Sequence, residues 1–131
     1  MAARGQEWDA AEALLAEAIA LDPIDPYALH DLAGLRIARG DAKGAAEAAE
    51  AAVARAPSLP PVLRRRAEVE MRRKDWTGAR AWMERLIAAD PAEPRWRYDL
   101  SSVLMQSGDL DGARAAVEEA LSQDTLPALA D

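Results

Sequence analysis

Cysteine is absent from this sequence of 131 residues, and histidine occurs only once, at His30. Without cysteine the chain has no disulfide, no thiolate nucleophile and no cysteine-ligated metal. A single histidine also leaves too few side chains for a Ser-His-Asp triad or a histidine metal site. We therefore expect a protein that is not an enzyme and that uses no metal or cofactor.

Long apolar runs are also missing. No stretch approaches the eighteen or so apolar residues that a membrane span needs, and the start, MAARGQEWD, lacks the pattern of a signal peptide. A glycine-rich phosphate loop is not present either, because the glycines recur at turns and near helix starts. A cytoplasmic protein without a membrane partner is the expectation that follows.

What the sequence does contain is a repeat of 34 residues. Two residue types recur at this period: Pro23, Pro57 and Pro91, and Asp41, Asp75 and Asp109. A fixed period in this range is typical of stacked helical repeats. In the clearest copy, which ends at Pro57, Asp25 caps a first helix and Pro26 starts it. Gly40 then ends this helix and Asp41 caps a second one.

The period divides one domain, residues 1–131, into about three and a half units. Residues 1–23 form a half repeat that keeps only a second helix, Trp8 to Leu21, after a turn at Gly5. Full repeats follow over residues 24–57, 58–91 and 92–125, and residues 126–131 are a tail or the start of a further helix. Seven main helices are therefore expected.

This unit resembles the tetratricopeptide repeat in its length and its helix-turn-helix pattern. The matching positions in the clearest copy are Leu29, Leu32, Ala33, Gly40, Asp41, Ala45, Ala52 and Pro57. The resemblance covers nearly the whole chain. It implies an all-α fold in which antiparallel helix pairs stack into a right-handed α-solenoid. It also implies a protein-interaction module or scaffold that binds a partner protein or peptide.

In this family the first helices line a concave groove, so the resemblance implies which residues face a bound peptide. They are Tyr27, His30, Ile37, Arg64, Glu68, Met71, Arg72, Arg95, Tyr98, Ser102 and Met105, with Gln106 beside them. The family's lysine and asparagine clamp for a terminal carboxylate is not carried over, because neither residue occupies these positions. An alternative interpretation of the stripe of Ile37, Met71 and Met105 is packing between adjacent helices.

Charge is distributed unevenly within the net total of −7. Residues 1–57 carry −5, residues 58–97 carry +4 and residues 98–131 carry −6. A basic middle favours an acidic partner, because charges of one sign in a concave wall reinforce one another's field. Solvated arginines on an exposed helix face are the alternative interpretation. Nucleic-acid binding through LRRRAEVEMRRK is disfavoured, since acidic units flank this stretch and no recognition motif accompanies it.

Two other functions remain open. The first helix lacks its partner and the last lacks a polar cap, so each is expected to expose an apolar face and to favour a homo-oligomer. The other alternative is that the array is the regulatory segment of a larger enzyme.

Three charged residues are expected to meet at the edge of the core. Arg36 and Glu70 lie one period apart, on neighbouring first helices, and Arg66 precedes Glu70 by four residues. Glycines also recur early in each second helix, at Gly44, Gly78 and Gly112. No reason for these glycines follows from the sequence alone.

Overall fold

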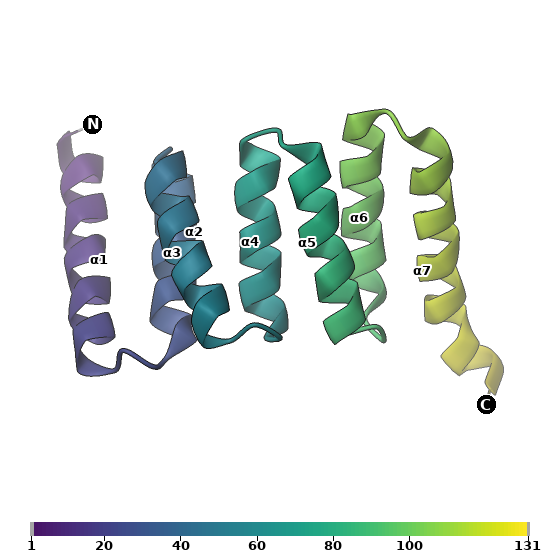
Figure 1. The fold of residues 1–131 in the computed structure, drawn as a ribbon, viewed down its shortest axis with the longest axis horizontal. Coiled ribbons are helices and arrows are strands. Elements are labelled where there is room, and N and C mark those ends of the chain that lie inside the picture. The colour runs from purple at the N-terminus through teal and green to yellow at the C-terminus, as the bar shows by residue number, and fades with distance from the viewer. Residues whose placement is uncertain (1, 131) are drawn as a thin grey trace.

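The computed structural model describes the backbone of residues 2–130 and the side chains of residues 5–124. The described backbone forms helices and no strand: α1 (Ala2–Leu21), α2 (Pro26–Ala38), α3 (Ala42–Arg55), α4 (Pro60–Arg72), α5 (Trp76–Ala89), α6 (Pro94–Ser107) and α7 (Leu110–Ala130). They follow one another along a row in which α2 lies in front of α3 in this view, and α1 and α7 lie at its two ends (Figure 1). The fold is the all-α solenoid that the repeat predicted.

Aspartate side chains cap the starts of several helices. The Asp25 carboxylate accepts a hydrogen bond from the Tyr27 N–H at 2.9 Å. Asp41, Asp75 and Asp109 each accept the backbone N–H of the glycine three residues later, at 2.9, 3.0 and 2.9 Å. Each bond satisfies one of the donors that a helix start leaves open. The caps predicted at Asp25 and Asp41 are therefore confirmed.

Each full repeat turns between its two helices through one residue with a positive φ angle. Gly40 has φ of 84° and Gly108 has φ of 90°, a region that glycine adopts without steric cost. The middle repeat has Lys74 at this point, with φ of 63°. A side chain in this left-handed region costs about 1–2 kcal/mol. The middle turn is thus the strained one.

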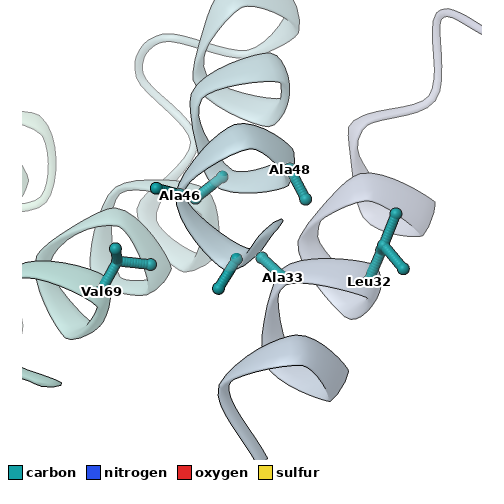
Figure 2. Close-up of a cluster of buried hydrophobic side chains, with 7 residues drawn as sticks. Leu32, Ala33, Ala46, Ala48 and Val69 are labelled. Carbon is teal, nitrogen blue, oxygen red and sulfur yellow. The ribbon is translucent and has the colours of Figure 1, made fainter. Parts of the chain in front are cut away.

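Neighbouring repeats pack through several clusters of buried apolar side chains. The cluster between α2, α3 and α4, called here the first cluster, contains four alanines of α3 with Leu32, Ala33 and Val69. Figure 2 shows short side chains of α3 and Ala33 between Leu32 on α2 and Val69 on α4. Such small residues let helices approach closely. The second cluster, between α4, α5 and α6, is bulkier and includes Met83 and Trp96.

The first helix is longer than the sequence predicted. Because α1 begins at Ala2, Gly5 lies within the helix, and the prediction of a turn at Gly5 is wrong. At the other end α7 includes residues 126–130, for which a tail or a further helix was expected, and residue 131 lies outside the described part. In the described part, no helix combines the length and the apolar character needed to cross a membrane.

The predicted charge cluster forms only in part. Glu70 is 5% exposed, and its carboxylate pairs with the guanidinium of Arg66. Arg36 was wrongly placed in this cluster. Its Nε lies 3.3 Å from the Glu12 carboxylate on α1, and its Nη1 donates to the Gly44 carbonyl at 3.0 Å. The half repeat at the start of the chain therefore supplies a partner that the repeat pattern did not indicate.

Candidate functional site

A pocket opens between the end of α4, the start of α5 and one side of α6. Its volume is about 510 Å³, which is within the usual range for ligand pockets. We call it the central pocket, and its lining residues are Met71, Arg72, Lys74, Trp76, Ser102, Val103 and Gln106.

The floor of the central pocket is apolar. Val103 is 1% exposed and belongs to the second cluster, against which Met71 and Trp76 also pack. Because these side chains are part of the core, the stacking of α4, α5 and α6 fixes their positions. The floor is therefore a preformed surface for an apolar group.

The rim of the central pocket carries two cations, Arg72 and Lys74. Both are exposed, and the ion pairs found within residues 5–124 include neither of them. On the α6 side, Ser102 and Gln106 add a hydroxyl and an amide. A carboxylate entering the pocket would meet charge-assisted donors without displacing an internal ion pair.

Lys74 reaches the rim from a strained turn. The equivalent residues of the neighbouring repeats, Gly40 and Gly108, are glycines that adopt the same left-handed conformation. A lysine there lowers stability relative to glycine. Strained residues of this kind cluster at functional sites. The conformation of Lys74 therefore marks this turn as a candidate for function.

Two residues of the predicted groove are held in ion pairs. Arg64 Nε lies 3.3 Å from Asp99 Oδ2, and Arg65 Nη1 lies 2.7 Å from Glu68 Oε1. The Arg65 guanidinium also covers Gly34, because a Cβ at position 34 would lie 2.8 Å from Arg65 Cζ. Both predicted residues thus already have a partner within the chain.

His30 and Tyr98 have partners too. His30 Nδ1 lies 3.1 Å from Asp31 Oδ1, and the Tyr98 hydroxyl donates to Asp124 Oδ2 at 3.0 Å. The hydrogen bond to Asp124 is the main cause that raises the pKa of Tyr98, and partial desolvation adds to it. Any ligand that contacts these side chains must compete with their existing hydrogen bonds.

The other predicted residues are dispersed over the molecule. Tyr27 is half exposed on α2, whereas Ile37 packs against the first cluster. Arg95 lies with its guanidinium carbon 5.6 Å from the centre of the Trp96 ring. Met105 is 60% exposed and lines a separate pocket at the α7 end. None of these four predicted residues lines the central pocket.

Three predicted residues do line the central pocket: Met71, Arg72 and Ser102. Gln106, expected beside them, lines it as well. Sequence reasoning missed Lys74, Trp76 and Val103. A signal for Lys74 was present, since it replaces glycine in a turn that the other two full repeats make with glycine.

The central pocket offers contacts suited to binding. Its one hydroxyl, that of Ser102, donates to the Tyr98 carbonyl at 3.4 Å. In the part of the chain with described side chains, no three histidine, aspartate or glutamate residues converge to hold a metal ion. Apolar area, positive charge and hydrogen-bond donors are what the pocket presents.

Solved structures of several proteins share this architecture. A crystal structure of MamA protein has a TM-score of 0.82 at 20% identity over 92% of this chain and 66% of that one. MamA 41-end from Desulfovibrio magneticus RS-1 has 0.80 at 16% over 93% and 69%. SycD, the type III secretion translocator chaperone of Yersinia enterocolitica, has 0.70 at 18% over 77% and 76%. The chain thus spans about two thirds to three quarters of these proteins, and the likeness concerns the fold. A comparison with curated proteins gave no match.

Family models described as tetratricopeptide repeat match almost the whole sequence. One matches residues 2–60, and another matches residues 36–98 and again residues 70–131. The overlapping matches run through every repeat that the 34-residue period defines. The chain belongs to the tetratricopeptide repeat family.

Proposed function

We propose that this chain is a protein-interaction module that binds an acidic peptide segment of a partner in the central pocket. Its family and its fold support the coarser role of a protein-interaction scaffold. The observation that carries the finer proposal is the apolar floor of the central pocket beside Arg72 and Lys74, two cations without an internal ion pair.

The chemistry of the pocket defines the peptide. A bulky apolar side chain would lie on the floor formed by Met71 and Val103. An aspartate or glutamate next to it would reach Arg72, whose guanidinium matches a carboxylate with two parallel hydrogen bonds. Gln106 is placed to bond the peptide backbone, and the Ser102 hydroxyl, which donates to Tyr98, can accept a hydrogen bond from a peptide N–H. The preferred motif therefore combines an apolar anchor with an adjacent carboxylate.

The charge distribution supports the same partner. Residues 58–97, which supply α4, α5 and the first turn of α6, carry +4, whereas the segments before and after them carry −5 and −6. A basic centre between acidic ends attracts an anionic peptide to the middle of the array. Because Arg72 and Lys74 are exposed, salt should weaken the binding.

Selection from a random peptide library tests the proposal. With the parent chain as bait, we expect enrichment of peptides that carry aspartate or glutamate within two residues of a bulky apolar side chain. A variant with Arg72→Ala and Lys74→Ala should lose this enrichment. The matched control is Lys43→Ala with Arg85→Ala, which removes the same charge from exposed positions outside the central pocket.

Two results would reject the proposed site. One is enrichment of peptides without acidic residues. The other is the same enriched motif for the parent and for the Arg72→Ala, Lys74→Ala variant, which would place peptide binding on another surface.

A further inference from the structure

The α7 end of the array repeats a surface that, inside the array, receives the next helix. Residues of this end surface and their counterparts one repeat earlier differ by 34 in number: Met105 and Met71, Leu110 and Trp76, Ala113 and Ala79, Val117 and Met83. The four end residues line a pocket of about 300 Å³ together with Arg114 and Glu118. We call this the end surface.

Inside the array, α6 covers the earlier copy of this surface. Trp96, Leu100 and Val103 of α6 lie at positions i, i+4 and i+7 and pack in the second cluster with Met83. At the end surface no helix of the described chain takes that place, and Met105 is 60% exposed. The end surface therefore lacks a helix that carries an apolar stripe with this spacing.

Helix α1 carries such a stripe on its outer side. Leu14, Ala18 and Leu21 lie at i, i+4 and i+7, and Leu14 and Leu21 are 66% and 87% exposed. A neighbouring side of α1 packs against the first cluster through Leu15 and Ile19. The molecule thus exposes an end surface and a matching apolar stripe on α1, and the two lie at opposite ends of the row (Figure 1).

We propose that a second copy of this chain docks the Leu14, Ala18 and Leu21 stripe of its α1 on the end surface, with the spacing that α6 uses on α5. The contact is head to tail, because it joins different surfaces of the two copies. Each added copy leaves one surface of each kind open, so association continues beyond a dimer. This self-association goes beyond peptide binding and does not use Arg72 or Lys74.

Electrostatics give this contact a distinctive salt dependence. In this contact, residues 1–57 of one copy meet residues 98–131 of the other. These segments carry net charges of −5 and −6. These charges repel at long range, and added salt screens the repulsion without removing the apolar contact. The association should therefore strengthen as the salt concentration rises, opposite to the binding of an acidic peptide at the central pocket.

Sedimentation velocity over a range of concentrations tests the proposal. The parent should form larger species as its concentration rises, and more of them at high salt. Leu14→Gln with Leu21→Gln, or Met105→Gln with Leu110→Gln, should weaken association roughly tenfold or more, since each pair removes two apolar side chains from the contact. All four positions are exposed, so the fold should persist, as circular dichroism will check. Ala81→Gln, at an exposed position on α5, is the control.

Mixing the two double variants separates a head-to-tail contact from a symmetric one. The α1 variant keeps an intact end surface and the other variant keeps an intact α1, so the mixture should form a one-to-one dimer and nothing larger. A parent that stays monomeric at all concentrations overturns the proposal. Assembly that survives in either variant alone, or variants that do not combine, also overturns it.

Discussion

Glu70 pairs with Arg66, one turn earlier on α4, at a place where the two side chains are only 7% and 11% exposed. Arg73 adds a longer contact to the same carboxylate, at 3.6 Å. Removing the carboxylate with Glu70→Ala leaves the Arg66 charge buried without its main partner. We expect a loss of about 3–5 kcal/mol in the free energy of unfolding. Urea denaturation measures it.

The control for this prediction is a pair of the same kind in solvent. Glu84 and Arg80 lie 2.9 Å apart on α5, with side chains that are about half exposed. Glu84→Ala should cost about 1 kcal/mol or less. If both glutamate variants unfold at the same urea concentration as the parent, Glu70 contributes no more than a surface charge.

The recurring glycines have a structural reason. A Cβ at Gly44 would lie 2.2 Å from Asp41 Oδ2 and 3.0 Å from Arg36 Cδ. Alanine favours a helix interior over glycine by about 1 kcal/mol, but here it would displace a capping carboxylate worth about 0.5–2 kcal/mol. Gly44→Ala should therefore lower the melting temperature. Gly5→Ala, with open space around the new methyl group, should leave it unchanged or raise it. A higher melting temperature for Gly44→Ala would contradict this explanation.

The strain at Lys74 predicts opposite effects on stability and binding. Lys74→Gly removes a side chain from the left-handed region, so we expect the free energy of unfolding to rise by about 1 kcal/mol. The same change removes one rim cation and should weaken the binding of an acidic peptide. Denaturation and peptide titration of this one variant measure both effects. A Lys74→Gly protein that is less stable than the parent would show that the lysine side chain has a structural role.

Tyr98 should titrate at unusually high pH. Its hydroxyl donates to Asp124, so the folded protein holds the phenolic proton more tightly than an unfolded chain with a tyrosine pKa of about 10. The stabilisation is complete below about pH 10 and is lost as the pH rises through the pKa of folded Tyr98. In a Tyr27→Phe background, ultraviolet absorbance follows Tyr98 alone. Adding Asp124→Asn should lower the midpoint, and an unchanged midpoint would mean that Asp124 does not hold the proton.

The architecture could be predicted because the information is local and repeated. Pro57, Gly40 and Asp41 mark helix ends and starts through backbone chemistry that needs no knowledge of distant residues. Three copies in register then determine how the helices stack. The structure departs from this prediction where a residue has a partner to which the 34-residue repeat does not relate it. Arg36, which pairs with Glu12, is the example.

The candidate site was less predictable than the fold. The family pattern indicates which positions of the repeat face a groove. It does not indicate which arginine and lysine side chains already form ion pairs within the chain. Arg64 and Arg72 occupy equally plausible positions in the sequence, yet Arg64 is paired with Asp99 and Arg72 lies at the rim of the central pocket. Lys74 was not predicted because it lies in a turn, whereas the family pattern places groove residues on the first helices.

The measurement that tests the central claim most directly is calorimetric titration of a library-selected acidic peptide into three proteins. These are the parent, the Arg72→Ala, Lys74→Ala variant and the Lys43→Ala, Arg85→Ala control. We predict that the first variant binds at least about tenfold more weakly, a loss of about 1.4 kcal/mol. The control, which carries the same net charge, should bind within about twofold of the parent. Equal affinities for all three proteins would contradict peptide binding at the central pocket.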